Sequence, residues 1–491
     1  MNTAPTPPPG PAPAPATSAS PTPASGPAPA SGPAPAVGTT PAPATATAPS
    51  PASGRPAAFL LTGSFLAVCR APLYLEELTR RGLRILLITP AAWRDQALAS
   101  RSEPGHPAAA IDDFAFVEGS VDREGSFNAG VVAAVRAWES RYEIVGAYAA
   151  GETLVEPTGL VADALGLPSP GLRASRVCRS KYLQRLYLGE FSPRALVVPP
   201  GGRDGADLSA VPFPAVVKPA TRHSSSGVRT VTDADALAAA LAEYPAHETI
   251  LVEEKVPGQE FSVEALVQHG RTVWSSVTVK RTTDAHADTF VELSHTVSGA
   301  PGPERDALLD VNERLLRRLD FRDGMTHSEW RLDAGGRPRL MEIAARTPGD
   351  GLTVLYHLAT GRPVEPEIIR IALGETAEYP APVRYARQVY LEHEPGTLEE
   401  VSVDWPGVGV EWAGEGDLWP EVRGGRADDP PTLRAVFTQK EKGSYVGPLN
   451  SSEDRVANFF IDAPGPAELD DLEARVRAAV TVRTAPAEPA G

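Results

Sequence analysis

Acidic residues at fixed offsets mark the stretch from Ile250 to Glu264, which reads ILVEEKVPGQEFSVE. An apolar run ends at Glu253, Val256 follows three residues later, and Glu260 opens an alternating segment after a Pro-Gly turn. Backbone groups of such a connector can hydrogen-bond an adenine edge, and the later carboxylate can accept the hydroxyls of a ribose. The pattern therefore predicts an adenosine pocket, although an ordinary hairpin with a solvated turn has the same pattern.

A second pair of acids lies in the segment MTHSEWRLDAGGRPRLMEIAAR. Glu329 and Glu342 each stand beside large apolar residues, on two strands predicted to form one hairpin. Burying such acids is costly unless they are paired or bind a metal, and two adjacent carboxylates repel unless a cation separates them. Hard oxygen ligands suit Mg²⁺, and Arg346 can meet phosphate or carboxylate charge. A structural Glu–Arg network is the alternative.

Basic and glycine-rich positions precede these acids. Lys218 ends the apolar strand VPFPAVVKPA, where a buried ammonium needs an anionic partner. Lys181 lies among helix formers, where a solvated lysine is the ordinary interpretation. The loop Ser224, Ser225, Ser226 and Gly227 separates two predicted strands. It is either a flexible hairpin turn or a lid whose backbone N–H groups fold over phosphate oxygens.

Composition restricts the class of protein. The chain has 491 residues and a formal net charge of −16, which disfavours sequence-independent binding to nucleic acid or anionic membranes. Residues 1–56 are almost wholly Pro, Ala, Ser, Thr and Gly, so we expect a disordered extension, with a second disordered tail over 483–491. The extension does not resemble a secretory signal, and no apolar run is long enough to span a membrane. Two cysteines favour a reducing, cytoplasmic location.

Three domains are expected between the tails. Apolar runs alternate with helical patterns over residues 57–151, which predicts an α/β fold with a doubly wound parallel sheet. Gly63 ends its first strand, but TGSFLAV lacks the G-x-G-x-x-G fingerprint, so we interpret it as a turn of the fold rather than a cofactor site. Residues 152–375 hold the motifs above, and residues 376–482 are typical of a β-rich α+β lobe.

Taken in order, these motifs resemble those of the ATP-grasp superfamily. Lys181, VVKP, SSSG, EEKVPGQE and the Glu329–Arg346 hairpin carry the resemblance, which extends over about residues 57–375. It is closest to the carboxylate–amine ligases that make dipeptides, the bacterial L-amino-acid ligases, in which MEIAARTPG has a similar counterpart. Ala344 departs from the superfamily, where Asn usually stands, which leaves open whether one or two metal ions bind.

The resemblance implies an ATP-grasp fold with a Rossmann-like N-terminal domain, and a role for each matching residue. The implied ATP contacts are Lys181, Lys218, the lid residues Ser224, Ser225, Ser226 and Gly227, the adenine-edge residues Glu253 and Val256, and the ribose acid Glu260. The implied metal ligands are Glu329 and Glu342, the implied catalytic groups are Glu342 and Arg346, and the implied substrate contacts are Glu292, His295, Arg346 and Gly349. For FVELSH, which holds Glu292 and His295, an exposed alternating strand is the alternative.

The resemblance implies an ATP-dependent carboxylate–amine ligase that forms an amide or peptide bond through an acyl phosphate and releases ADP and phosphate. Expected cofactors are ATP and Mg²⁺, or Mn²⁺ in its place. Expected partners are a small-molecule carboxylate and amine, both amino acids, and a homodimer is compatible with the family. The alternatives are a ligase or carboxylase that acts on another carboxylate, and a nucleotide-binding module without turnover.

Overall fold

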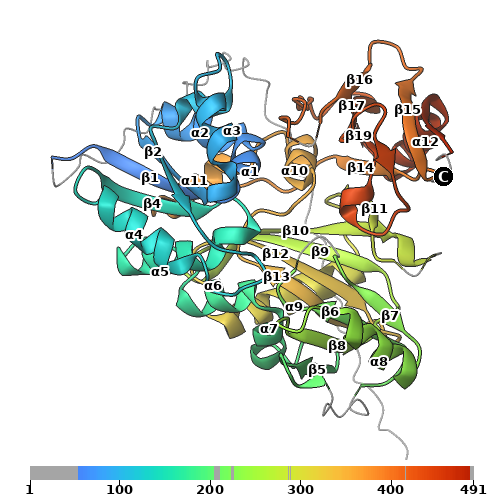
Figure 1. Cartoon of the computed structure of the whole chain (residues 1–491). Helices are drawn as coiled ribbons and strands as arrows, with labels where there is room; N and C mark the ends of the chain where they lie inside the picture. Colours follow the sequence, from blue (N-terminus) through green and yellow to red (C-terminus); the bar gives the residue numbers. More distant parts are fainter. Residues whose placement is uncertain are drawn as a thin grey trace, which may run out of the picture. The chain divides into compact units, whose positions relative to one another are not determined.

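The computed structural model describes residues 54–203, 211–222, 226–285, 287, 289–414 and 416–486 (Figure 1). All of them belong to one compact unit, Ala46–Gly491. Most of the predicted N-terminal extension therefore lies outside the described residues. None of the described helices is both long and apolar enough to cross a membrane. Cys69 and Cys178 are free and buried.

The N-terminal part is a four-stranded parallel sheet in the order β3-β2-β1-β4. The strands are β1 (Ala57–Thr62), β2 (Arg84–Pro90), β3 (Asp113–Val117) and β4 (Glu143–Ala149). The helices are α1 (Phe65–Cys69), α2 (Pro72–Arg80), α3 (Arg94–Arg101), α4 (Asn128–Trp138) and α5 (Val155–Ala164). Because helices cover both faces, β1 is a continuous apolar run, which confirms the predicted fold class. At Gly63, where φ is +146°, an added Cβ would lie 3.4 Å from the backbone nitrogen of Gly151.

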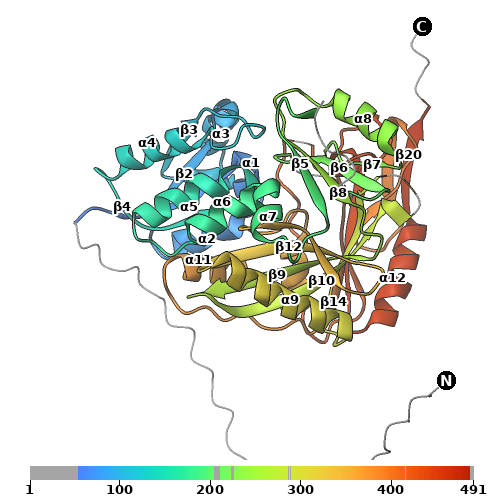
Figure 2. The same ribbon diagram turned by 90° about the horizontal axis from the view of Figure 1, so that it is seen from below.

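A small antiparallel sheet follows in the order β5-β8-β6-β7. Its strands are β5 (Ala195–Val198), β6 (Ala215–Pro219), β7 (Arg229–Val231) and β8 (Ile250–Glu254), with helix α8 (Ala234–Glu243). Helices α6 (Leu172–Arg179) and α7 (Lys181–Tyr187) continue the series α4, α5 toward this sheet (Figure 2).

The largest sheet has nine strands in the order β13-β12-β9-β10-β11-β14-β19-β17-β16. These are β9 (Glu260–Gln268), β10 (Arg271–Thr282), β11 (Glu292–Val297), β12 (Gly324–Leu332), β13 (Pro338–Ala344), β14 (Tyr385–Leu391), β16 (Val410–Trp412), β17 (Thr432–Thr438) and β19 (Ala457–Ala463). The sheet thus joins strands of the predicted second and third domains, and the boundary between those domains stays a prediction.

Alternation along β9 gives the sheet two different faces. Phe261, Val263 and Ala265 pack in the apolar cluster that includes helix α9 (Pro303–Leu319) (Figure 2). The intervening residues Glu260 and Glu264 therefore lie on the opposite face, as the period of two along a strand requires. This opposite face carries the acids discussed below.

Helices α10 (Leu352–Thr360) and α11 (Glu365–Ala372) join the N-terminal sheet to the nine-stranded sheet. Tyr356 and Ile368 from these helices share one buried cluster with Phe59 of β1 and Leu266 of β9. The parts of the chain that carry the candidate site are therefore packed on a common core.

The remaining elements form the C-terminal edge. Strands β15 (Gly396–Val403), β18 (Tyr445–Val446) and β20 (Val480–Ala485) make a three-stranded sheet in the order β18-β15-β20, and helix α12 (Pro466–Ala479) precedes β20. The prediction that a disordered tail begins at residue 483 was wrong, because residues up to Ala485 belong to strand β20. Arg483 pairs with Glu400 and Ala485 with Thr397 in the sheet, because β15 offers a free edge for the last strand.

Candidate active site

An open cleft that encloses about 830 Å³ of empty space, part of it continuous with solvent, lies between the antiparallel sheet β5-β8-β6-β7 and the polar face of the nine-stranded sheet. Nine of the predicted site residues line it: Lys181, Lys218, Ser226, Glu253, Val256, Glu260, Glu292, Glu329 and Glu342. Arg346, His295, Gly349 and Gly227 are not among the lining residues. Ser224 and Ser225 lie outside the described residues. The structure therefore brings together residues that are far apart in the sequence.

Glu253 and Lys218 form the inner wall of the cleft on neighbouring strands β8 and β6. The Lys218 ammonium lies 2.8 Å from the Glu253 carboxylate, and the guanidinium of Arg185 on α7 lies 2.5 Å from its other oxygen. Burial would raise the pKa of Glu253, but the two cations outweigh it and lower that pKa to about 2. Burial dominates at Lys218 and lowers the pKa of its ammonium. The Glu253 side chain is thus engaged by two cations, and its backbone is paired with Ala195 and Val216 in the sheet.

Lys181 begins helix α7 and reaches the opposite wall. Its ammonium donates to Glu342 Oε1 at 2.9 Å and to the carbonyl oxygen of Arg222 at 2.8 Å. Only 10% of the Lys181 side chain is exposed, so this residue is not the solvated lysine that is ordinary in a helix. An ammonium held by one carboxylate in a cleft is suited to exchange that contact for a phosphate oxygen.

Glu329 and Glu342 stand directly opposite each other on β12 and β13, as predicted for the hairpin. Oε1 of Glu329 contacts the Lys280 ammonium at 2.5 Å and His327 Nε2 at 3.3 Å. Among the residues that the structure describes, no hydrogen bond reaches Oε2 of either glutamate. Two carboxylate oxygens available at one cleft wall fit the hard-ligand set that Mg²⁺ prefers. Ala344 supplies no ligand atom.

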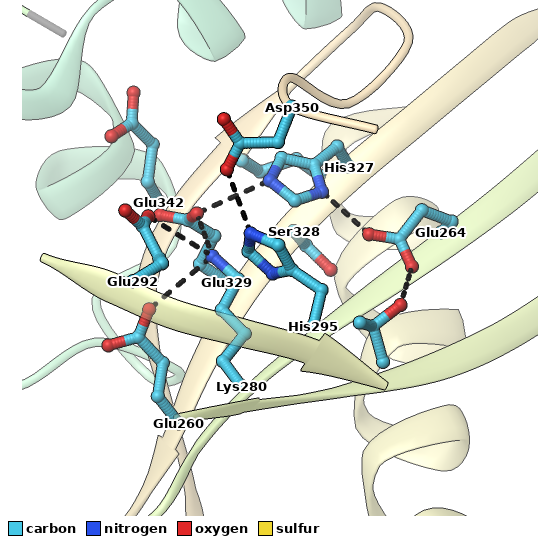
Figure 3. Close-up of polar contacts among 12 residues, drawn as sticks. Glu260, Glu264, Lys280, Glu292, His295, His327, Ser328, Glu329, Glu342 and Asp350 are labelled. Atoms are coloured by element: carbon cyan, nitrogen blue, oxygen red, sulfur yellow. Dashed lines mark hydrogen bonds and ion pairs between the residues drawn. The ribbon is translucent and has the colours of Figure 1, made fainter. Parts of the chain in front are cut away.

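The Lys280 ammonium is the centre of an acidic group that sequence reasoning missed (Figure 3). It lies 2.5 Å from Glu329, 3.4 Å from Glu260 and 3.8 Å from Glu292. Ligand atoms of these three acids lie within 4.8 Å of one another. Burial would lower the pKa of Lys280, but the carboxylates raise it well above its ordinary value. Burial would raise the pKa of Glu329, but Lys280 and His327 outweigh burial and hold that pKa well below its ordinary value.

Glu260, the predicted ribose acid, begins β9 beyond the connector. Its Oε2 accepts from Arg331 Nε at 2.9 Å, and Arg331 also donates to Asp284. Val256, the predicted adenine-edge residue, is buried in the connector and gives its carbonyl oxygen to Arg331 at 3.4 Å. Arg331 therefore ties the connector to the sheet and fixes where Glu260 meets the cleft.

Glu292 and His295 sit on β11, beside residues from the C-terminal edge. Ser452 Oγ donates to Glu292 at 2.8 Å, and Arg455 lies 3.9 Å from the same carboxylate. His295 Nε2 lies 2.8 Å from Asp350, which accepts two hydrogen bonds from Arg455. The Nδ1 atom of His295 is buried and has no hydrogen-bond partner among the described residues. The strand is therefore not the exposed one of the alternative interpretation, because His295 is 1% exposed.

Arg346 follows β13 and faces the N-terminal part. Its Nε donates to Glu152 at 2.7 Å, and its Nη1 donates to the carbonyl oxygen of Thr347 at 2.7 Å. Burial would lower the pKa of Arg346, but Glu152 and the more distant Glu342 raise it. Gly349 is exposed, and nothing lies within 4 Å of an added Cβ there. Arg346 is thus a guanidinium fixed against Glu152, and it does not belong to the residues that line the cleft.

Of the predicted lid, the structure describes Ser226 and Gly227. Ser226 lines the cleft, and Gly227 has φ of +74°, in the left-handed region that favours glycine. Tyr244 donates to the Gly227 carbonyl oxygen at 2.5 Å. The loop is therefore tied to helix α8 at this end.

Three cations of the site escaped sequence reasoning for one reason. Arg185, Lys280 and Arg331 lie in segments whose other residues look like ordinary helix or strand positions. For Lys280 the pattern pointed the other way, because Ser276, Thr278 and Lys280 alternate with apolar residues, which is typical of a solvent-facing side. The structure buries all three, and the buried ammonium is met by carboxylates.

The fold and the cleft define the class of protein. Residues 211–354 match the family model for an ATP-grasp domain, and the chain carries that domain. Over nearly its whole described length it also has the fold of an L-amino acid ligase from Bacillus licheniformis, with a TM-score of 0.64 at 19% identity, covering 88% of this chain and 99% of that one. Phosphoribosylglycinamide synthetase from Anaerococcus prevotii has a TM-score of 0.56 at 13% identity, covering 88% and 100%. At these identities the likeness shows the fold alone.

Several curated relatives match parts of the chain, and two of them have informative names. Carnosine synthase 1 from Gallus gallus is 29% identical over 243 residues, which cover 44% of this chain and 26% of that protein. The ATP-grasp enzyme fsqD from Aspergillus fumigatus is 27% identical over 205 residues, covering 38% and 36%. The chain spans at most half the length of the curated relatives it matches. The ATP-grasp resemblance read from the motifs is confirmed.

Proposed function

We propose that this chain is an ATP-dependent carboxylate–amine ligase that joins two amino acids through an acyl phosphate. One observation carries the proposal. The lysines, the connector and the acid pair, found in ATP-grasp order along the sequence, converge on one cleft of about 830 Å³. The likeness in fold to an L-amino acid ligase and the partial match to carnosine synthase 1 support an amino-acid substrate.

ATP would bind with its base at the connector and its phosphates at the lysines. Glu253 and Val256 would meet the adenine edge, and Glu260 would accept the ribose hydroxyls. Lys218 and Lys181, on opposite walls, would contact phosphate oxygens, and Ser226 would cover them together with Ser224, Ser225 and Gly227. Lys181 would leave Glu342 for a phosphate, which frees that carboxylate at the same moment.

Glu329 and Glu342 would hold Mg²⁺, which when bound neutralises phosphate charge and orients the transferring group. Arg346 would stabilise charge on the phosphoryl group and on the acyl oxygen, because Glu152 keeps its guanidinium in place. Glu292 would take the ammonium of an amino-acid substrate, and His295 Nδ1 offers a buried polar contact next to it. Gly349 would leave room for substrate backbone.

The reaction needs activation because a carboxylate and an ammonium do not condense at neutral pH. Attack of the substrate carboxylate on the γ-phosphorus of ATP would form the acyl phosphate and release ADP. A neutral amine would then attack the acyl carbon, with phosphate as the leaving group and one proton lost from nitrogen. Positioning and charge neutralisation account for such catalysis, which needs no covalent enzyme intermediate.

The three-part division into residues 57–151, 152–375 and 376–482 belongs to the same proposal, as does a cytoplasmic location. In it the second part would supply Glu152 as well as the nucleotide and metal contacts, and the third part would supply the residues around Glu292. Ser452 and Arg455 support the last assignment, because they reach Glu292 from the C-terminal edge.

The test is ADP release over a matrix of amino-acid pairs, with mass spectrometry of the products. A ligase gives ADP only with a competent pair, together with a product lighter by one water than the sum of the two. ADP release with a carboxylate alone, or with bicarbonate, would favour a ligase or carboxylase on another substrate. ATP binding without substrate-dependent ADP release would favour a nucleotide-binding module.

A further inference from the structure

His327 lies between two carboxylates on the polar face of the nine-stranded sheet, one buried and one at the cleft (Figure 3). Its Nδ1 lies 2.7 Å from Oε1 of Glu264, and its Nε2 lies 3.3 Å from Oε1 of Glu329. Glu329 lines the cleft, whereas the Glu264 side chain has no exposed surface. The imidazole therefore connects a wholly buried acid to a proposed metal ligand.

Glu264 is held in place from every side. Its Oε2 accepts from Thr278 Oγ1 at 3.0 Å and from the hydroxyl of Tyr356 on α10, while Oε1 faces His327. A buried carboxylate is costly unless its oxygens are hydrogen-bonded and its charge is met. The two ring nitrogens of His327 face Glu264 and Glu329, and these two contacts fix the orientation of the ring.

This arrangement selects between the two oxygens of Glu329. Lys280 and His327 both donate to Oε1, and among the described residues no hydrogen bond reaches Oε2. The carboxylate is thus held by one oxygen with the other available to the cleft. Glu342, the second proposed ligand, contacts Lys181 and has no contact with His327 among the described residues. The control exerted by His327 is therefore specific to Glu329.

We propose that His327 and Glu264 are positioning residues that orient Glu329 toward the divalent cation accompanying the nucleotide. The inference rests on the proposed function, because it assumes a metal at Glu329. It adds a function for a buried acid and a histidine that lie outside the cleft lining.

The test measures metal affinity directly rather than turnover. Mn²⁺ is titrated by electron paramagnetic resonance into the full chain saturated with ADP, for the parent, Glu264→Gln and His327→Gln. Glu264→Gln removes the charge that faces the His327 ring, and His327→Gln removes the ring itself. Loss of such an outer contact weakens metal binding by about 10-fold or more. ADP affinity in EDTA should stay unchanged, since neither residue lines the cleft. His357→Gln on α10 is the matched histidine control and should keep parent Mn²⁺ affinity.

A milder variant distinguishes a loss of metal binding through misfolding from a loss through misplacement of Glu329. Tyr356→Phe removes one donor to Glu264 and keeps the ring in the core, so it should weaken Mn²⁺ binding in the same direction by a smaller factor. Parent-like Mn²⁺ affinity in folded Glu264→Gln and His327→Gln would overturn the inference. Failure of the parent itself to bind Mn²⁺ with ADP would instead overturn the metal site of the proposed function, and the two failures are therefore distinguishable.

Discussion

Replacing Glu253 by Gln tests how the inner wall of the cleft is held together. The substitution keeps the shape of the side chain and removes its charge. Arg185 and Lys218, whose side chains are 4% and 10% exposed, would then be left without their carboxylate. Removing one partner of a buried ion pair is strongly destabilising, because the other charge stays buried and uncompensated.

The magnitude follows from the pKa of Glu253, which is lowered from 4.5 to about 2. At about 1.4 kcal/mol per pKa unit, the ionised carboxylate contributes about 3 kcal/mol of stability at pH 7. A lowered carboxyl pKa gives stability that is fully present above the unfolded-state value of 4.5 and is lost as pH falls through the folded-state value. At pH 3 linkage leaves roughly half of that contribution.

The assay is urea unfolding of the parent and Glu253→Gln at pH 7 and pH 3. We expect the difference in unfolding free energy to be about 3 kcal/mol at pH 7 and roughly half that at pH 3. Glu254→Gln is the neighbouring control, because its side chain is 43% exposed and lies 4.0 Å from Arg194. A difference below about 1 kcal/mol, or one that does not shrink toward pH 3, would refute the ion-pair account.

Three further predictions concern other parts of the chain. Glu342→Gln should lower ADP formation at least about 100-fold with the melting temperature kept, because it removes charge from the proposed metal site, and unchanged turnover would exclude that role. Glu292→Gln should raise the KM of one amino acid by about 10- to 100-fold and leave the KM of ATP alone, as a charged hydrogen bond to an ammonium requires. If both KM values rise together, Glu292 supports the site as a whole. Deleting residues 2–53, whose composition offers little to bury, should change neither turnover nor the melting temperature, and a loss of several degrees would show packing on the body.

Sequence patterns with strong physical causes predicted most of the fold. The doubly wound sheet was predictable because buried parallel strands are largely apolar, as β1 is up to Thr62. The hairpin that carries Glu329 and Glu342 was predictable from its AGG turn, but the exact pairing was not, because an irregularity between Glu329 and Trp330 shifts the register by one residue. The last strand was missed at Arg483 because a short alternating segment has no stability of its own, and its order depends on the distant edge of β15.

The candidate site was predictable for residues within motifs and not for their partners. Lys218, Glu253 and Glu342 stand in recognisable segments, and all line the cleft. Lys280 contacts acids that are 20 and 49 residues away, so only the sheet order reveals its neighbours. Arg185 and Glu253 likewise make a tertiary contact, because they are 68 positions apart in the sequence.

The most direct measurement of the central claim follows oxygen from the carboxylate substrate. An amino acid labelled with ¹⁸O in its carboxylate is incubated with ATP, Mg²⁺ and a competent amine, and the released phosphate is analysed by mass spectrometry. Ligation through an acyl phosphate transfers one labelled oxygen to each phosphate, with one phosphate per amide formed. Phosphate without label, or ADP release that does not depend on either substrate, would contradict the account.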